Sequence, residues 1–237
     1  MKKARKPLQI RKQRLKDLPR TDCVCGASNY EIEKEFGCWS CGKPFDMKPP
    51  TTPLPEESKK KIILDLCGGT GSWSRPYKEV GYEVRVITIP HYDVRDYIPP
   101  KNVHGILAAP PCTDLAGSGA RWWKQKGYQA LLDALAVADA CLRIIMVTKP
   151  VFWALENPVG RLSRYYGKPV MSFHPYEYGD PYQKRTLLWG VFNTPVKTPV
   201  KPVEGQKIWR MAPGPKRQEE RSITPPGFAN AFFKANQ

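Results

Sequence analysis

The sequence has 237 residues, 41% of them hydrophobic, which is enough for one full-sized α/β domain and a small additional module. Its formal net charge of +16 favours a polyanionic partner. No segment has the ~20 apolar residues of a membrane-spanning helix, and the basic start lacks the apolar core of a secretion signal. These features exclude membrane and secreted classes, so we expect an intracellular protein with reduced cysteines.

The first segment, residues 1–20, is a basic arm. It holds nine Lys and Arg residues and a single acid, Asp17, and therefore carries half of the net charge. Such an arm attracts nucleic acid, so we expect DNA or another polyanion as the partner. A solubilising tail or a localisation signal is the alternative interpretation.

Residues 21–46 contain two closely spaced cysteine pairs, each followed by glycine and separated by twelve residues. Four thiolates in this pattern suit a closed tetrahedral zinc site, and metal would supply most of the folding energy of so short a segment. The alternative, two disulfides, is disfavoured inside a cell. We predict a zinc-ribbon-like module, followed by a proline-rich linker over residues 47–60, with the ligands Cys23, Cys25, Cys38 and Cys41.

The main domain, residues 61–192, alternates strand and helix patterns. The clearest helix is Tyr128–Val147, in which apolar residues recur at spacings of four and three. Strands interrupted by helices predict an α/β fold, with a mostly parallel sheet and helices on both faces. The predicted strands are Ile62–Leu66, Glu83–Ile89, Val103–Ala109, Val151–Leu155 and Thr186–Phe192.

Two segments follow the main domain. Residues 193–220 are rich in proline and lysine and are predicted to form a stiff linker. Residues 221–237 form the C-terminal segment, with a helix predicted near Gly227–Ala235.

A glycine-rich turn, Asp65–Trp73, follows the first strand of the main domain and should lead into a helix. Glycines let the backbone approach a ligand, and a helix amino terminus offers free N–H groups. The pattern suits a nucleotide or S-adenosylmethionine, although by itself it equally suits a plain tight turn. It lacks the Gly-Lys-Ser/Thr ending of a phosphate-binding loop.

Two further motifs place a thiol and an acid at strand ends. Cys112 follows the rigid pair Pro110-Pro111, and the next predicted strand ends in Glu156-Asn157-Pro158. Carboxyl ends of parallel strands share one sheet edge, so the thiol and the carboxyl should face one pocket beside the glycine-rich turn. Taken alone, a cysteine here would more often be an inert packing residue.

The order of these motifs resembles that of the DNA cytosine-5 methyltransferases. The turn at Asp65–Trp73 is similar to that family's cofactor loop, Pro111-Cys112 to its nucleophile loop and Glu156-Asn157 to its Glu-Asn-Val block. Arg185–Gly190 is similar to its Gln-x-Arg-x-Arg block, and Ser222–Pro226 to its closing block. The resemblance spans residues 62–192 and 221–235. It implies a Rossmann-like methyltransferase sheet, S-adenosylmethionine as cofactor and DNA as substrate.

The resemblance also assigns roles to individual side chains. It makes Cys112 the nucleophile, with Glu156 and Arg185 as catalytic partners. The implied cofactor-binding residues are Asp65, Gly68, Gly69, Gly71, Trp73, Asp93 and Pro110. The substrate-binding candidates are Pro111, Asn157 and Gln183, together with Arg121 and Lys124, which belong to a flexible, basic, aromatic segment after Cys112 that could hold phosphates. In this chemistry the thiolate adds to C6 of a flipped-out cytosine while the acid stabilises charge at N3, so that C5 can accept the methyl group.

The sequence departs from the family in several places. Cys67 stands where the cofactor turn usually has Phe, and the second strand ends at Ile89-Pro90, where an acid usually binds the ribose. Gln183 stands where the first arginine of the Arg block is expected, and Ser222 replaces Asn. Only about thirty residues separate Gly190 from Arg221, so a large target-recognition domain has no room before the closing block and we expect short or relaxed sequence specificity.

Three alternatives remain at this stage. One is a catalytically inactive, zinc-containing DNA-binding protein with a methyltransferase-like domain. The others keep the covalent chemistry but act on RNA or on a free pyrimidine nucleotide, which the basic arm disfavours. Small enzymes of this pattern resemble phage-encoded methyltransferases, which implies a cytoplasmic location in a prokaryotic or phage-infected cell.

Overall fold

The computed structural model describes residues 20–22, 28–30, 60–212, 214 and 217–237. The chain divides into two compact units, residues 1–58 and 59–237. In the first, β1 (Arg20–Asp22) pairs with β2 (Ser28–Tyr30) as a short antiparallel ladder. The four predicted zinc ligands all lie outside the described residues, so the zinc-ribbon-like module stays a prediction.

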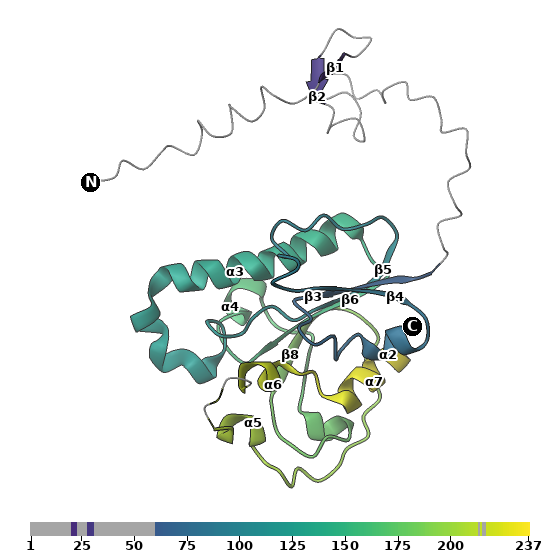
Figure 1. Cartoon of the computed structure of the whole chain (residues 1–237). Coiled ribbons are helices and arrows are strands. Elements are labelled where there is room, and N and C mark those ends of the chain that lie inside the picture. Colours follow the sequence, from purple (N-terminus) through teal and green to yellow (C-terminus); the bar gives the residue numbers. More distant parts are fainter. Residues whose placement is uncertain (1–19, 23–27, 31–59, 213, 215–216) are drawn as a thin grey trace. The chain divides into compact units, whose positions relative to one another are not determined.

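The second unit is built on one six-stranded sheet with the strand order β4-β3-β5-β6-β8-β7 (Figure 1). Its first four strands run parallel to one another, β8 is antiparallel to β6, and β7 is antiparallel to β8. The mixed α/β architecture predicted from the alternating pattern is therefore confirmed. The strand bounds are β3 Ile62–Leu66, β4 Glu83–Ile87, β5 Val103–Ala108, β6 Phe152–Pro158, β7 Met171–Phe173 and β8 Thr186–Val191.

Helices lie on both faces of this sheet (Figure 1). The longest, α3 (Trp123–Thr148), begins five residues earlier than the apolar stripe indicates and contains a break at Gly127, with φ 76° and ψ −176°. The break separates a first turn, residues 123–126, from the long helix that packs on the sheet. The other helices are α2 Arg75–Glu79, η2 Gly117–Trp122, α4 Ser163–Tyr166, η3 Pro175–Tyr178, α5 Lys207–Arg210, α6 Arg217–Ser222 and α7 Pro226–Ala235.

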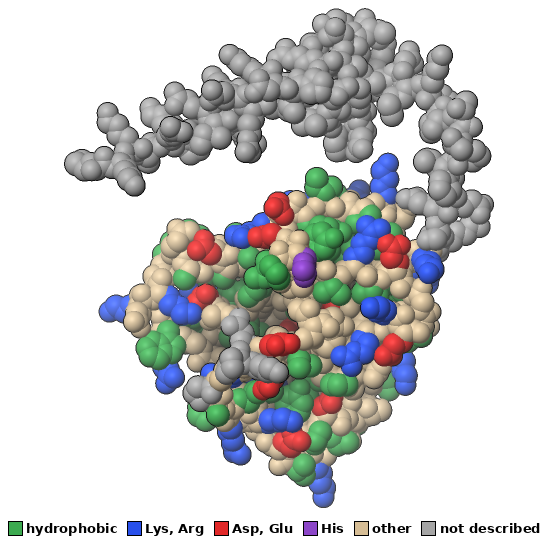
Figure 2. Space-filling view, in the orientation of Figure 1, with side chains coloured by type: hydrophobic (Ala, Val, Ile, Leu, Met, Phe, Trp, Pro, Cys, Tyr) green, Lys and Arg blue, Asp and Glu red, His purple; other side chains and the backbone are tan. Residues whose placement is uncertain are grey.

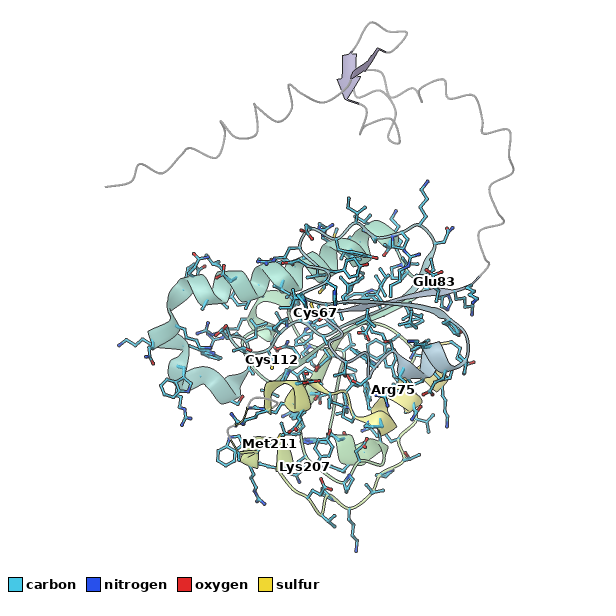
Figure 3. The ribbon with its side chains drawn as sticks, viewed as in Figure 1. Cys67, Arg75, Glu83, Cys112, Lys207 and Met211 are labelled. Carbon is cyan, nitrogen blue, oxygen red and sulfur yellow. The ribbon has the colours of Figure 1, made fainter. Side chains whose placement is uncertain are left out.

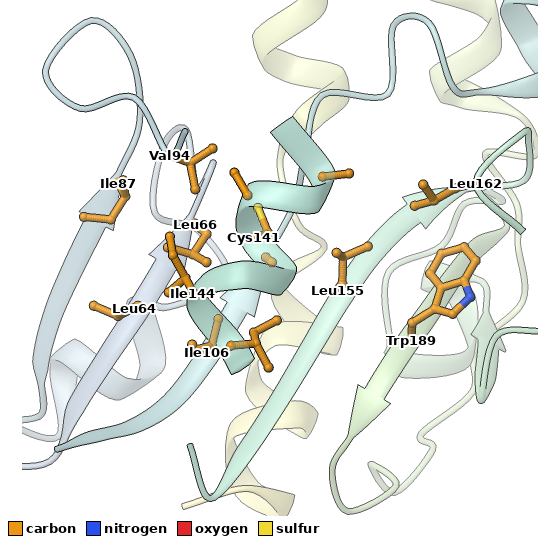
Figure 4. Packing of buried hydrophobic residues seen from close by; sticks show 14 of the residues in the cluster. Leu64, Leu66, Ile87, Val94, Ile106, Cys141, Ile144, Leu155, Leu162 and Trp189 are labelled. Carbon is orange, nitrogen blue, oxygen red and sulfur yellow. The ribbon is translucent and has the colours of Figure 1, made fainter. Parts of the chain in front are cut away.

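The alternation of side chains along the strands produces two cores. Leu64 and Leu66 of β3 pack with Cys141 and Ile144 of α3 on one face (Figure 4). Ile63, between the two leucines, packs into the opposite core with residues of α2 and α7. Successive strand residues point to opposite faces, so buried strands need apolar residues at both positions, and β3 provides them at every position except Asp65.

The second core joins the beginning and the end of the domain. Trp73, at the end of the glycine-rich turn, packs against Phe232 of α7 with ring centroids 5.5 Å apart. The hydroxyl of Tyr77 in α2 donates to the carbonyl oxygen of Asn236 over 2.9 Å. The C-terminal helix is therefore part of this core.

The proline- and lysine-rich segment after β8 runs beside η3 and the loop that connects η3 to β8. Backbone N–H groups of Thr198 and Val200 donate to the carbonyls of Glu177 and Tyr176, and that of Gln183 donates to Gly205. These bonds hold the first half of the predicted linker against the domain. Within the described residues, no helix is long and apolar enough to cross a membrane.

Candidate active site

The strand order reverses direction between β3 and β5. β3 has β4 on one side and β5 on the other, and the backbone N–H of Ala109 continues the pairing by donating to Leu66 over 2.9 Å. Ligands of open α/β sheets bind at the carboxyl ends of the strands at such a switch point. Cys67 and Cys112 follow these two neighbouring strands and lie near the centre of the domain in Figure 3.

The glycine-rich turn closes over a buried carboxylate. Asp65 has no solvent exposure, and its Oδ2 atom accepts a 2.5 Å hydrogen bond from the hydroxyl of Ser74. A Cβ atom at Gly68 would lie 2.4 Å from that carboxylate, so only glycine lets the backbone pass over it. Gly69 and Gly71 have φ of 52° and 68°, which L side chains rarely adopt.

Burial raises the pKa of Asp65 to about 6, against the lowering effect of the Ser74 hydrogen bonds. Its Oδ1 atom is buried and has no hydrogen-bond partner. A buried acceptor without a donor is costly and commonly marks a functional position. The turn above it is open, because Gly69 is exposed and a Cβ added there would meet nothing within 4 Å.

The Pro-Pro-Cys and Glu-Asn-Pro motifs are joined directly. The side-chain amide of Asn157, itself buried, donates to the carbonyl of Pro110 over 2.9 Å. The loops that follow are also paired, because Gly117 N–H donates to the carbonyl of Val159 over 2.7 Å. These contacts hold the Cys112 loop against the end of β6, as the shared sheet edge predicted.

Cys112 and Glu156 interact electrostatically. Burial raises the pKa of the half-buried Cys112 thiol, and the neighbouring Glu156 raises it further, whereas Lys184 and Arg221 lower it. Burial also raises the pKa of Glu156, and Lys184 opposes that shift. Although solvent reaches part of Glu156, its Oε2 atom is buried without a hydrogen-bond partner.

A small pocket lies on the side of the sheet covered by α7. Glu156 and Lys184 are its charged lining residues. At the pocket, the segment before α7 meets the glycine-rich turn, because the N–H of Thr224 donates to the hydroxyl of Ser72 over 2.9 Å. Its full lining is Trp73, Glu156, Phe173, Lys184, Thr186, Thr224, Pro225 and Phe228.

The cation that acts on both Cys112 and Glu156 is Lys184, which no sequence motif indicated. Arg185, the predicted catalytic arginine, is exposed, and its charge acts on His174 rather than on Cys112 or Glu156. Strand alternation could have indicated this arrangement. In β8, Leu188 lies in the core under α7 and Leu187 lies in the core under α3. Because alternate residues of a strand share a face, counting back by twos places Lys184 on the face of Leu188, where the pocket lies, and Arg185 on the opposite face.

The remaining predicted binding residues are dispersed. Asp93 forms hydrogen bonds with the side chain and backbone of Arg95, which lower its pKa to about 2. Trp73 is 2% exposed and forms one wall of the pocket from within the core. Pro110 is buried, Pro111 is exposed, and Gln183 is half-buried with its N–H bonded to Gly205.

The segment after Cys112 presents aromatic and basic side chains. Trp122 is 49% exposed with the guanidinium of Arg121 5.1 Å from its ring centroid, and Lys124 is also exposed. Trp123 is covered instead by Arg161 at 3.8 Å. Figure 2 shows Lys and Arg side chains spread over the visible face of the domain, with fewer acidic ones between them.

No group of three or more His, Cys, Asp or Glu residues suited to a metal ion occurs in the described part of the chain. No protein-family model matches the sequence, and no curated protein matches it. One similar solved structure is an E. coli prophage protein described as a candidate DNA modification methyltransferase, with 17% identity and a TM-score of 0.35. The match covers 56% of this chain and 47% of that one, and a likeness of this degree carries no functional argument.

Proposed function

We propose that the chain is an S-adenosylmethionine-dependent DNA cytosine-5 methyltransferase with Cys112 as its nucleophile. The observation that carries the proposal is the hydrogen bond from Asn157 to Pro110, which joins the two motifs at the switch point of the sheet. The neighbouring Glu156 carboxyl consequently raises the pKa of the Cys112 thiol. A thiol and a proton-holding acid at one sheet edge are what attack on an unreactive pyrimidine requires.

The residues of the glycine-rich turn fit the proposed cofactor. The unpartnered Oδ1 of Asp65 suits the cofactor's ammonium group, and the open backbone at Gly69 leaves room for a ligand to lie against the turn. Gly68 and Gly71 would shape that surface, and Pro110 would bound it from the β5 side. When bound, S-adenosylmethionine would supply an electrophilic methyl group.

Cys112 and Glu156 would divide the chemistry of the base between them. Cys112, once it loses its proton, forms a bond to C6 of cytosine, and the electron pair displaced from the C5–C6 bond is delocalised toward N3. Glu156 donates its proton to N3, a role suited to a carboxyl whose pKa is raised by burial. Once C5 carries the methyl group, a water molecule would take the C5 proton, the electrons of that C–H bond would re-form the C5–C6 double bond, and Cys112 would leave as the thiolate while N3 returns its proton to Glu156.

The DNA would be held by groups around the Cys112 loop. The target atom lies inside a duplex stack, so the base must leave it. Arg121 and Lys124 are exposed and can contact phosphates, while the exposed ring of Trp122 can stack on bases or fill the gap. Pro111, Asn157 and Gln183 stay substrate-binding candidates. The basic arm and the predicted zinc module would add affinity in place of a recognition domain.

Two measurements test this proposal. Bisulfite sequencing of plasmid DNA from cells expressing the chain should show cytosine methylation, and DNA containing 5-fluorocytosine should form a covalent adduct with the purified protein. Both signals should disappear in Cys112→Ser and persist in Cys141→Ala, which changes a cysteine of the α3 core. Methylation that persists in Cys112→Ser would reject the assignment of the nucleophile.

The second candidate is a catalytically inactive DNA-binding protein, and one feature favours it. The end of β4 presents the exposed apolar Ile89 at the predicted ribose position, and the nearby Asp93 is already bonded to Arg95. In that case the protein should bind DNA without forming an adduct and without binding S-adenosylmethionine in calorimetry.

A further inference from the structure

Lys184 lies on the pocket face of the sheet, and its charge acts on both Cys112 and Glu156. It lines the pocket together with Glu156, and its ammonium group donates to the carbonyl oxygen of Arg221 over 3.0 Å. That bond fixes a long, flexible side chain at the end of α6. A lysine held by a neutral carbonyl keeps its full charge available to other groups.

Few other charged groups act on Cys112 and Glu156. The charged and titratable groups acting on Cys112 are Glu156 at the end of β6, Lys184 before β8 and Arg221 in α6. For Glu156, Lys184 is the neighbouring charge that opposes the effect of burial. Lys184 is therefore the one cation within the described residues that acts on both groups.

The proposed chemistry needs such a shared cation. Attack requires an ionised thiol and a carboxyl that holds a proton, and transfer of the thiol proton to an ionised Glu156 reaches that state. The pair carries one negative charge throughout, but that charge moves from oxygen to sulfur. A partly buried negative charge is costly unless a cation stays close to it in both positions.

We propose that Lys184 is a positioning residue whose ammonium group balances the single negative charge that Cys112 and Glu156 share. This inference rests on the proposed function for its purpose. The electrostatic effect of Lys184 on Cys112 and Glu156 does not depend on what the enzyme methylates. The exposed Arg185, although it resembles the family's arginine, does not occupy this place.

The test measures the thiol directly and needs neither DNA nor cofactor. In the full chain, the rate of alkylation of Cys112 by iodoacetamide is followed against pH, with the Cys112 peptide quantified by mass spectrometry. In Lys184→Met the midpoint should move upward by about one pH unit, which slows alkylation about tenfold at a given pH below it. Lys184→Arg should restore the midpoint, and Lys168→Met, at an exposed site before β7, is the charge-matched control.

Additional variants keep the outcome interpretable. If Lys184→Met fails to fold by circular dichroism, Lys184→Gln takes its place. Glu156→Gln should move the midpoint downward, because it removes the negative charge that opposes ionisation of the thiol. An unchanged profile in a folded Lys184→Met or Lys184→Gln variant, or a shift of equal size in Lys168→Met, overturns the inference.

Failure of this inference can be told apart from failure of the proposed function. A shifted profile in a protein that never methylates DNA would support the role of Lys184 and reject the methyltransferase. If the enzyme methylates DNA but the pH profile of Cys112 alkylation is unchanged in Lys184→Met, the methyltransferase is supported and the role of Lys184 is rejected. In the active enzyme, Lys184→Met should lower kcat at neutral pH with little change in the KM for S-adenosylmethionine, since Lys184 lies on the base side of the site.

Discussion

Asp65→Asn is expected to change the way that stability depends on pH. In the folded chain the Asp65 carboxyl is fully buried and its pKa is raised from 3.8 to about 6. The folded state therefore binds a proton more tightly than the unfolded state. As pH rises from the unfolded pKa of 3.8 to the folded pKa of about 6, ionisation of Asp65 lowers the free energy of unfolding. A difference of about two pKa units corresponds to about 3 kcal/mol in the free energy of unfolding above pH 6.

The measurement compares the wild type with Asp65→Asn by urea denaturation at several pH values. Asparagine cannot ionise, so the difference in unfolding free energy between the two proteins should change in favour of the variant by about 1.4 kcal/mol from pH 5 to pH 8. At 2–4 °C per kcal/mol, this equals roughly 3–6 °C in relative melting temperature. Any cost of packing the asparagine amide is the same at both pH values, so it cancels from this comparison.

Asp96→Asn is the matched control, because Asp96 is an exposed aspartate on the loop after β4. It should show no comparable change between pH 5 and pH 8. Parallel curves for wild type and Asp65→Asn would refute the claim that a buried, ionisable carboxylate lies under the glycine-rich turn. Under the proposed function, Asp65→Asn should also weaken S-adenosylmethionine binding in calorimetry, so the same residue would cost stability and serve the cofactor.

The remaining changes concern the Asn157 bond, the glycine-rich turn, the basic arm and the predicted zinc module. Asn157→Ala leaves the carbonyl of Pro110 without its donor and should lower the unfolding free energy by about 1–3 kcal/mol in urea melts; no loss would show that water replaces the bond. Gly68→Ala should destabilise by about 1–3 kcal/mol because its Cβ meets the Asp65 carboxylate, and Gly69→Ala should cost less because its Cβ meets open space and only its positive φ is strained; the reverse order would contradict this geometry of the turn. Deleting residues 1–46 should weaken DNA binding and flatten its salt dependence, measured by fluorescence anisotropy, because the basic arm is removed; unchanged binding at moderate salt would reject a role for this region. In the full chain, metal analysis should find one zinc per molecule that the change Cys38→Ser removes.

Much of the fold follows from local patterns. Four apolar residues within 62–66 set the extent of β3, because a strand buried on both faces is mostly apolar; Asp65 is the exception. The proline pair after residue 109 sets the end of β5, because proline cannot continue the ladder. The α3 stripe was correctly recognised but its beginning was not. The turn at 123–126 is exposed on most positions and therefore has no apolar periodicity to detect.

The sequence by itself determined that Cys112 and Glu156 lie at the carboxyl ends of two successive parallel strands, and parallel strands bring these ends to one edge whatever the rest of the chain does. Only the tertiary structure decided which groups surround that pair. Lys184 depends on its bond to Arg221, 37 residues later, and the pocket depends on Ser72 meeting Thr224, 152 residues later. Such contacts arise from the packing of α7 and the C-terminal segment on the sheet, and no local pattern of residues encodes a meeting over that distance.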